Sequence, residues 1–206
     1  MIEYDGVNQT VLGAIPRDAG EVLDVGCGTG ALGAALKLRQ PARVTGVTFS
    51  EREAARATLV LDAVHVADLN GFDVTTLGTF DCMVCSHVLE HLHAPDRFLR
   101  AARPAVRGTL VVALPNPLVF RQRLEFLRGR FRYTDGWLMD RTHVRFFDWH
   151  TARELVADSG YRIEEARADG YLPLSRLLPP LRKSLDRAAV TRWPGLFGWQ
   201  FVIVAH

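Results

Sequence analysis

The stretch LDVGCGTGALG, residues 23–33, places four glycines within eleven positions at the end of an apolar run. Its last three glycines have the G-x-G-x-x-G spacing of dinucleotide-binding loops, whereas its first three have the tighter G-x-G-x-G spacing. A dinucleotide-binding loop has its first glycine directly after a strand and an acidic residue about 20 positions later. Gly26 directly follows the apolar run, and Thr48 stands where that acidic residue would be expected. The sequence therefore favours the tighter spacing.

Segments typical of strands alternate with segments typical of helices around this loop. Strands are expected at residues 21–26, 42–49, 63–68, 80–86, 108–115, 161–167 and 198–206. Helices are expected at residues 31–39, 51–60 and 94–104. Because this alternation requires crossover connections between neighbouring strands, it predicts an α/β fold with a mostly parallel sheet. The length of 206 residues suits a single domain over residues 1–206.

Two insertions interrupt the alternation, at residues 116–149 and 168–197. The first follows the fifth strand, at the sheet edge where open α/β sheets bind ligands, so we expect it to cover the substrate. Residues 116–147 hold seven arginines and three acidic residues, a net charge of +4, which indicates a solvated basic face or an anion-attracting rim. The second insertion is predicted to hold one helix after Pro180.

The composition indicates a globular protein, with 48% hydrophobic and 23% charged residues and a net charge of only +2. Such a balance gives no sign of a nucleic-acid partner. No apolar run reaches the roughly 20 residues of a transmembrane segment, and the N-terminus lacks a signal-peptide pattern, so a cytoplasmic location is expected. Cys82 and Cys85 form C-x-x-C within a predicted strand, which places them on opposite faces and favours a core role over a redox or metal role. The oligomeric state stays open, with a homodimer as one option.

Four segments of the chain resemble motifs of the class I S-adenosylmethionine (SAM) dependent methyltransferases. VLDVGCGTG (22–30) is similar to motif I of that family. VADL (66–69), FDCMVCSHVLEHL (80–92) and DRTHVRFFDWHTARELVADSGY (140–161) resemble segments of its small-molecule O-methyltransferase subgroup, which includes ubiquinone-pathway enzymes. The resemblance implies an enzyme with a Rossmann-like sheet of seven strands in the order 3-2-1-4-5-7-6, with strand 7 antiparallel and helices on both faces.

The resemblance further implies SAM as cofactor, bound by ten residues: Asp24, Gly26, Cys27, Gly28, Gly30, Thr48, Phe49, Asp68, Leu69 and Ser86. Glycines allow close approach of the backbone, and N–H groups near a helix N-terminus suit the carboxylate of the methionine part. Asp68 is expected to accept from the adenine amine, with a turn cap as the alternative. Family members usually carry an acidic residue at the end of strand two for the ribose; Thr48 stands there, so Thr48, Phe49 or Glu51 is left to meet the ribose.

The segment HVLEH (87–91) follows the fourth predicted strand. On a helix, His87 and His91 would share one face. The candidate catalytic residues are His143, His87 and His91, with His143 expected to act as general base. Related O-methyltransferases carry Glu at the first place of this segment and bind a divalent cation there. A cation such as Mg²⁺ is therefore a candidate second cofactor, with His87, Glu90, His91 and Asp140 as candidate ligands; a purely structural role of Glu90 and His91 is the alternative.

The H-x-x-E-H spelling of residues 87–91 also occurs in inverted zinc peptidases, but the flanking segments favour a methyltransferase. The expected acceptor is a small molecule, first of all a hydroxyl of a sugar or glycoside. This hypothesis rests on aromatic residues expected around His143: Tyr133, Trp137, Phe146, Phe147 and Trp149. Two alternatives stay open. One is methylation of a quinone, phenol or other small metabolite on oxygen or carbon; the other is a SAM-binding module without catalysis.

Overall fold

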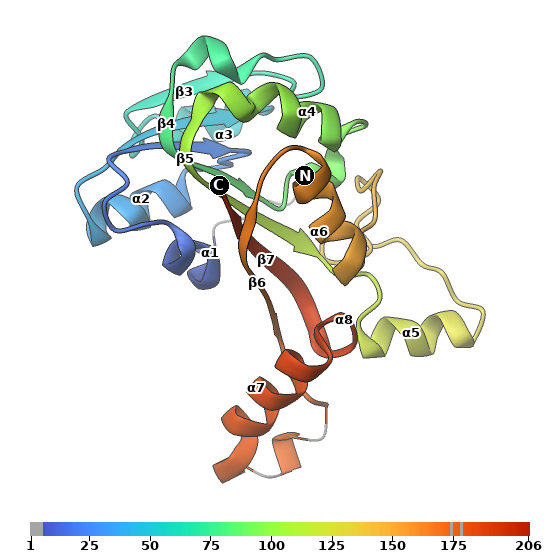
Figure 1. The fold of residues 1–206 in the computed structure, drawn as a ribbon. Helices are drawn as coiled ribbons and strands as arrows, with labels where there is room; N and C mark the ends of the chain where they lie inside the picture. Colours follow the sequence, from blue (N-terminus) through green and yellow to red (C-terminus); the bar gives the residue numbers. More distant parts are fainter. Residues whose placement is uncertain (1–5, 174, 178) are drawn as a thin grey trace.

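The structure is a computed structural model that describes residues 6–173, 175–177 and 179–206 (Figure 1). Seven strands form one sheet in the order β3-β2-β1-β4-β5-β7-β6. They are β1 (Glu21–Val25), β2 (Arg43–Thr48), β3 (Ala63–Val66), β4 (Phe80–Ser86), β5 (Val106–Pro115), β6 (Ile163–Gly170) and β7 (Gly198–Ala205). The first five strands are parallel, and β7 runs antiparallel between β5 and β6. This confirms the predicted fold class, strand order and antiparallel last strand.

Helices connect and flank the strands. The α-helices are α1 (Gln9–Ala14), α2 (Ala31–Arg39), α3 (Glu51–Ala57), α4 (Pro95–Ala102), α5 (Phe120–Leu127), α6 (Trp149–Asp158), α7 (Arg182–Arg192) and α8 (Pro194–Phe197). Short 3₁₀ helices are η1 (Val74–Leu77), η2 (Leu89–His91), η3 (Arg103–Ala105), η4 (Ser175–Leu177) and η5 (Pro179–Leu181). Within the described residues, no helix has the length and apolar character needed to cross a membrane.

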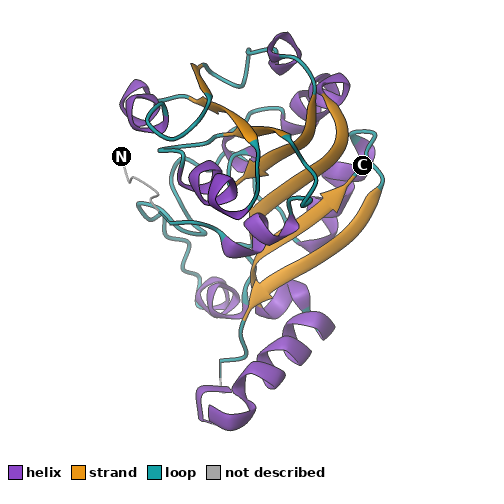
Figure 2. Cartoon of the chain, turned by 90° about the vertical axis from the view of Figure 1, so that its left-hand side faces the viewer, coloured by secondary structure: helices purple, strands orange, loops and turns teal. Residues whose placement is uncertain are grey.

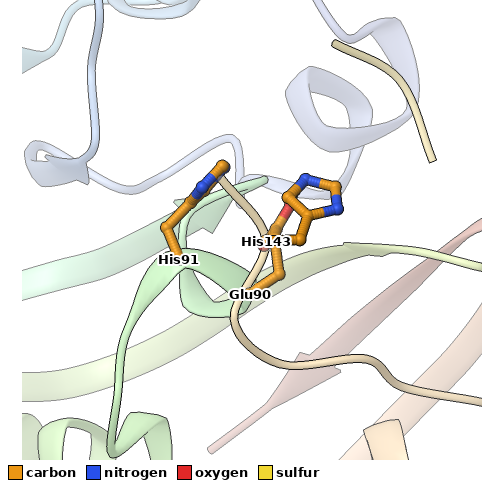
Figure 3. A group of neighbouring side chains, drawn as sticks. All are labelled: Glu90, His91 and His143. Atoms are coloured by element: carbon orange, nitrogen blue, oxygen red, sulfur yellow. The ribbon is translucent and has the colours of Figure 1, made fainter. Parts of the chain in front are cut away.

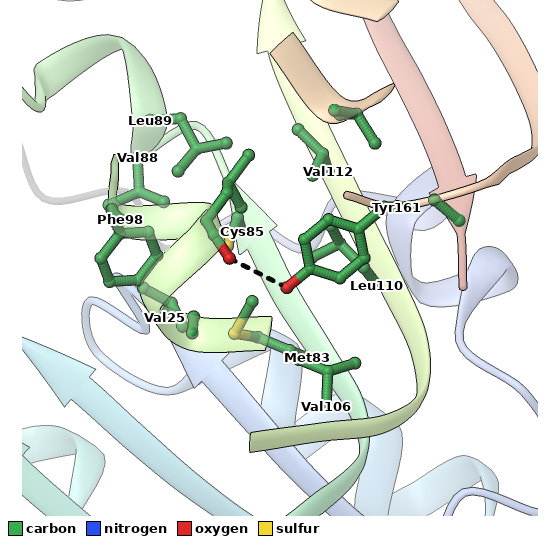
Figure 4. Close-up of a cluster of buried hydrophobic side chains, with 14 of the residues drawn as sticks. Val25, Met83, Cys85, Val88, Leu89, Phe98, Val106, Leu110, Val112 and Tyr161 are labelled. Carbon is green, nitrogen blue, oxygen red and sulfur yellow. Dashed lines mark hydrogen bonds between the residues drawn. The ribbon is translucent and has the colours of Figure 1, made fainter. Parts of the chain in front are cut away.

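Helices lie on both sides of the sheet (Figure 2), and the sheet separates two hydrophobic cores. Because side chains alternate along a strand, Leu23 and Val25 of β1 face one core and Val22 faces the other. The first core lies under α4 and α6, where the Tyr161 hydroxyl donates to the Leu99 carbonyl at 3.2 Å (Figure 4). The second core lies under α1, α2 and α3. Helices on both faces are therefore confirmed.

The two cysteines of the C-x-x-C segment show whether side chains of β4 alternate between the two faces of the sheet. Cys85 belongs to the core under α4 and α6, and Cys82 belongs to the core on the opposite face. Both side chains are fully buried, and burial raises the pKa of each thiol above its ordinary value. The predicted core role is confirmed, because buried thiols held protonated on opposite faces of a sheet cannot chelate one metal ion together.

The first insertion contains α5 and a turn closed by a bridge between Thr134 and Asp140. It is fastened to the sheet by Asn116, which is fully buried. The Asn116 side-chain amide donates to the carbonyls of Gly195 and Gly198, at 3.1 and 2.6 Å. The insertion therefore begins from a fixed point beside β7.

The second insertion is shorter than predicted, because residues 168–170 belong to β6 and pair with β7. The sequence did not predict a strand there, since these residues, ADG, do not show the alternation of apolar and polar residues that is typical of strands. The predicted helix after Pro180 is α7, which extends beyond the end of the sheet (Figure 1). Its Asp186 carboxylate accepts the backbone N–H of Leu172 at 2.8 Å, which ties α7 to the end of β6.

Substitution of Asn116 tests this fastening. Asn116→Ala should lower the free energy of unfolding by about 1–3 kcal/mol, because two carbonyls would lose their buried donor. Thr58→Ala, which removes an exposed hydroxyl at the end of α3, serves as control and should change stability by less than about 0.5 kcal/mol. Urea denaturation of both variants measures the difference. Equal stabilities of the two variants would contradict the fastening role.

Candidate active site

The carboxyl ends of β1 and β4 form the natural ligand-binding edge of this sheet. These strands are neighbours, and the chain continues from them toward opposite sides of the sheet, β1 toward β2 and β4 toward β5. Open α/β sheets bind ligands at such a switch point, outside the carboxyl ends of the strands. The glycine loop follows β1, and the segment that begins at His87 follows β4. The two sequence motifs are therefore brought to one place.

The glycine loop is tightly packed at one position and open at another. The backbone N–H groups of Gly26 and Cys27 donate to the Val47 carbonyl at 2.8 and 2.9 Å, which fastens the loop to β2. A Cβ on Gly26 would lie 2.8 Å from the Val88 side chain, which follows β4. A Cβ on Gly28, where φ is +52°, would meet no atom of the described residues within 4 Å. Among these residues, the space in front of Gly28 is open to a ligand.

Asp24 lies below this loop, near the end of β1, and is only 3% exposed. Its Oδ2 atom is buried and accepts no hydrogen bond from any residue that the structure describes. Burial raises the pKa of Asp24 to about 7. A buried carboxylate oxygen without a donor calls for a partner from outside the chain, and an ammonium group would suit it. The loop and Asp24 together fit the amino-acid end of SAM.

The remaining predicted cofactor residues lie along the same edge. Leu69 packs against the core under α4 and α6, Ser86 ends β4 half-buried, and Phe49 is 72% exposed. Asp68 is exposed, and its Oδ1 accepts the backbone and side-chain N–H groups of Asn70, each at 2.9 Å. This is the turn cap that the sequence left open as the alternative for Asp68. A contact between Asp68 and adenine stays a prediction.

Thr48 has an unexpected partner. Its hydroxyl donates to Oε2 of Glu53 at 2.8 Å, and Thr48 itself is buried. Glu53 was not among the predicted site residues. A signal was present, since SERE, residues 50–53, has the S-x-x-E pattern of a helix start. That pattern places the glutamate in the first turn of α3, within reach of the end of β2.

The segment HVLEH is not one helix, the condition under which His87 and His91 would share a face. His87 has a left-handed backbone with φ of +54°, and its N–H donates to the Ala113 carbonyl at 3.0 Å, so helical structure begins only with η2. His87 and His91 therefore do not share a helix face. His87 points to β7, where its Nε2 lies 2.7 Å from Oε1 of Gln200. A left-handed non-glycine residue costs energy, and residues strained in this way cluster at active sites and ligand clamps.

The tautomer of His87 follows from its neighbours. Gln200 is fully buried, and its amide Nε2 donates to Asp169 at 2.6 Å, so its Oε1 is an acceptor. His87 must therefore carry a proton on Nε2, which leaves Nδ1 facing Oε1 of Glu90 at 3.5 Å. Partial burial opposes a charge on His87, but the hydrogen bond and charge of Glu90 outweigh it and raise the His87 pKa.

Glu90, His91 and His143 form a close group (Figure 3), and their ligand atoms all lie within 4.8 Å of one another. Glu90 is 1% exposed, and its Oε1 lies 3.9 Å from Nε2 of His143. His91 donates from Nδ1 to the Thr142 carbonyl at 3.1 Å, and its ring meets that of His143 edge-on at 4.8 Å. Burial lowers the His143 pKa, so the ring is neutral at pH 7.

Backbone hydrogen bonds hold this group together from two distant segments. The Glu90 carbonyl accepts the N–H groups of Val144 and Arg145, at 2.9 and 3.0 Å. The Arg145 guanidinium also donates from Nε to the His93 carbonyl at 3.0 Å. These hydrogen bonds hold the end of the first insertion against η2, and they position His143 beside Glu90.

The group differs from the predicted metal set of His87, Glu90, His91 and Asp140. His143 is a member, whereas His87 is bound to Gln200. Asp140 accepts through Oδ1 from the backbone N–H and the hydroxyl of Thr142, at 2.8 and 2.7 Å. Its side chain shapes the turn before His143, as an Asx turn does, because the short carboxylate reaches the N–H two residues later.

The expected aromatic cluster around His143 is wrong. The ring of Phe146 lies 6.3 Å from that of His143. The other four rings pack elsewhere: Tyr133 on Phe131, Trp137 on Trp199, Trp149 on Phe201, and Phe147 in the core under α4 and α6. Proximity in sequence misled the prediction, because α6 begins at Trp149 and the ring of this residue packs on Phe201 of β7.

A cavity of about 450 Å³ lies within the first insertion. Its lining residues are Arg121, Gln122, Glu125, Arg130, Arg132, Thr134, Trp137, Leu138 and Met139. Glu125 pairs with Arg128 and Arg130, at 3.1 and 3.7 Å. Within the described ranges, no carboxylate forms an ion pair with Arg121 or Arg132. The cavity therefore has a positive wall, and Leu138 and Met139 connect it directly to the turn that carries His143.

Comparison with known proteins gives consistent results. A family model described as a methyltransferase domain matches residues 6–166. The ubiquinone biosynthesis O-methyltransferase of Chromobacterium violaceum is 33% identical over 76% of this chain and 71% of that protein. The malonyl-(acyl-carrier protein) O-methyltransferase of Geobacter sulfurreducens is 29% identical over 81% of this chain and 64% of that protein. Matches to curated relatives span between 21% and 71% of those proteins' own lengths.

Solved structures share the fold. A SAM-dependent methyltransferase from Mesorhizobium loti has a TM-score of 0.64 and 20% identity, and the match covers 96% of this chain and 95% of that one. The magnesium protoporphyrin IX methyltransferase of Synechocystis, solved with bound S-adenosylhomocysteine (SAH), has a TM-score of 0.65 and 16% identity over 96% of this chain and 82% of that one. Fold, motifs and the family match together show that this chain belongs to the class I SAM-dependent methyltransferases.

Proposed function

We propose that this enzyme transfers the methyl group of SAM to a hydroxyl oxygen of a small molecule that carries an acidic substituent. The observation that carries the proposal is the buried group of Glu90, His91 and His143 at the carboxyl edge of β4. The contact of Gly26 with Val88 places this edge directly beside the glycine loop. A potential base and the methyl donor would therefore meet at one place.

Ten residues are proposed to hold SAM: Asp24, Gly26, Cys27, Gly28, Gly30, Thr48, Phe49, Asp68, Leu69 and Ser86. When bound, SAM supplies an electrophilic methyl group on a positively charged sulfur, which an acceptor oxygen displaces in line. Asp24 offers its unpartnered oxygen to the ammonium group, and Gly28 leaves the loop backbone open. The exposed ring of Phe49 offers a flat apolar surface to the adenine.

His143 is proposed as the general base that removes the hydroxyl proton of the acceptor. Burial lowers its pKa, so the ring is unprotonated and ready to accept at pH 7. Its Nδ1 is buried and has no hydrogen-bond partner in the described part of the chain, and its Nε2 faces Glu90. With the proton of the neutral ring on Nε2, Nδ1 carries the lone pair that would accept the proton. Glu90 then stabilises the imidazolium that forms, as an opposite charge within about 4 Å does.

A divalent cation is the second candidate role for the same residues. The three that converge offer one carboxylate and two imidazoles. Mg²⁺ prefers oxygen ligands, whereas imidazole suits zinc, iron, copper or nickel, so this donor set fits Mg²⁺ less well than the predicted set would have done. His87 is proposed to shape the acceptor site through Glu90, because its Nδ1 faces Oε1 of Glu90 at 3.5 Å and it does not belong to the group of three residues whose ligand atoms converge.

The acceptor is proposed to be a phenol-like hydroxyl compound with a carboxylate or phosphate. Arg121 and Arg132 in the cavity wall have no carboxylate partner among the described residues and favour an anionic group, since guanidinium pairs well with both anions. The named activities of the ubiquinone biosynthesis relatives favour an aromatic hydroxyl. The aromatic residues give no support to a sugar acceptor, because four of the five rings expected around His143 pack elsewhere. A sugar or glycoside remains an acceptor to be tested.

Gly28→Val tests the cofactor loop. A branched side chain at a backbone with φ of +52° is strained and would fill the open space, so SAH binding should fall below detection. The wild-type protein should gain thermal stability with SAH by mass action and gain none with NAD. Differential scanning fluorimetry measures both. Stabilisation by NAD but not by SAH would contradict the cofactor assignment.

His143→Ala tests the base. It should lower kcat by about 10²–10⁴-fold and leave SAH affinity unchanged, because a base contributes to the transition state alone. The acid limb of the wild-type pH–rate profile should lie below pH 6.5, since burial lowers this pKa. His150→Ala, at an exposed position of α6, is the control and should keep full turnover.

Two outcomes of the same assay decide against the base. Full turnover of His143→Ala would remove the assignment. Loss of wild-type turnover in EDTA, with recovery on addition of Mg²⁺, Mn²⁺ or Zn²⁺, would instead assign the group of Glu90, His91 and His143 to a metal ion.

Arg121→Gln and Arg132→Gln test the acceptor class. Each should raise KM for acidic phenols by about tenfold, the loss expected for one charge-assisted hydrogen bond, and leave KM for neutral phenols unchanged. Arg17→Gln, at an exposed site near the N-terminal helix, serves as control. Steady-state kinetics with acidic phenols, neutral phenols and sugars supply the comparison. Highest turnover with neutral sugars, unaffected by the arginine substitutions, would contradict the acidic acceptor.

A further inference from the structure

The last residue of β2 is not an acidic residue that could bind the ribose of SAM. Thr48 ends that strand, and a hydroxyl cannot accept from two neighbouring ribose hydroxyls as the two oxygens of a carboxylate can. A carboxylate nevertheless lies at this place. Glu53, in the first turn of α3, has its Oε2 2.8 Å from the Thr48 hydroxyl, which donates to it.

Hydrogen bonds of both its backbone and its side chain fix the position of Glu53. Its backbone N–H donates to the Ser50 side chain at 3.3 Å, which sets the start of α3. Its side chain is held by Thr48, which is 3% exposed and therefore has little freedom to turn away. The hydrogen bonds found among the described residues occupy Oε2 and leave Oε1 unused. One carboxylate oxygen is thus anchored, and the other is available.

This carboxylate lies on the cofactor side of the fold. Thr48 directly follows Val47, whose carbonyl holds the N–H groups of Gly26 and Cys27 in the glycine loop. Burial is the main cause of the raised pKa of the Cys27 thiol, and the negative charges of Asp24 and then Glu53 raise it further. Glu53 is therefore close enough to the glycine loop for its charge to be felt there.

We propose that Oε1 of Glu53 accepts a hydrogen bond from a ribose hydroxyl of SAM, in place of the acidic residue that is missing from the end of β2. The acid has moved from the strand into the first turn of the next helix, and Thr48 is the residue that aims it. Phe49, between them in sequence and 72% exposed, borders the same space. The inference rests on the family assignment and is independent of the acceptor.

Glu51 is the competing carboxylate, because it begins α3 and was one of the residues left open for the ribose. Glu51 is exposed, and among the described residues it has no bond that turns it toward Thr48. Glu53 is half-buried and bonded to Thr48. The geometry therefore favours Glu53.

The test measures binding of SAH by isothermal titration calorimetry, without any acceptor. Glu53→Gln should weaken SAH binding by about 10- to 100-fold, the range for lost hydrogen bonds to a charged group. Thr48→Val, which removes the group that aims Glu53, should weaken it by a smaller factor. Glu154→Gln, at an exposed position of α6, is the control and should bind SAH as the wild type does.

A ribose-modified ligand makes the test specific. An SAH analogue without the 2′-hydroxyl should bind the wild type more weakly than SAH does. In Glu53→Gln the difference in affinity between SAH and the analogue should shrink or vanish. The substitution and the loss of the 2′-hydroxyl remove the same interaction, so their effects on binding are not additive. Urea denaturation confirms that Glu53→Gln is folded, and Glu53→Asp serves as a second variant that keeps the charge but shortens its reach.

Three results would overturn the proposal. The first is wild-type SAH affinity in Glu53→Gln. The second is a loss of affinity for the deoxy analogue, relative to SAH, that is as large in Glu53→Gln as in the wild type. The 2′-hydroxyl would then contact a residue other than Glu53. The third is weakened binding in Glu51→Gln alone. Absence of SAH binding to the wild type would contradict the cofactor assignment itself, and so differs from a failure of Glu53.

Discussion

The site depends on the buried carboxylate of Glu90. A carboxylate at 1% exposure is costly to bury, and neither oxygen of Glu90 has a hydrogen-bond partner among the described residues; ring nitrogens of His87 and His143 face Oε1 at 3.5 and 3.9 Å. His87 reaches it from the end of β4 and is itself held by Gln200 of β7. His143 reaches it from the end of the first insertion. Glu90 thus joins the sheet, the last strand and the insertion at one point, and its own carbonyl clamps the insertion a second time.

Much of the fold could be predicted from local sequence. The helix at residues 31–39 was predicted with the bounds it has, and the strands were predicted to within a few residues, because apolar runs bounded by glycine and polar residues mark buried parallel strands. The strand order came from the resemblance to a family rather than from periodicity. Core placement of Cys82 and Cys85 followed from side-chain alternation alone.

The details of the site could not be predicted in the same way, since they depend on contacts across the fold. His87 lies outside any helix because Gln200, 113 positions later, binds its ring and Ala113 binds its N–H. The aromatic residues near His143 in sequence were drawn into packing with Phe131, Trp199 and Phe201. Glu53 was signalled by the S-x-x-E pattern, but its bond to Thr48 requires the distance between α3 and β2, which sequence does not provide.

In the proposed function, the cofactor loop and the group of Glu90, His91 and His143 serve one reaction at one edge of the sheet. A crystal structure of the SAH complex would decide this. We expect SAH across the carboxyl ends of β1 and β2, with its amino-acid end at Gly28 and its sulfur toward His143. A complex in which SAH lies elsewhere, or in which its sulfur faces away from His143 and Glu90, would show that the loop and this group do not act together.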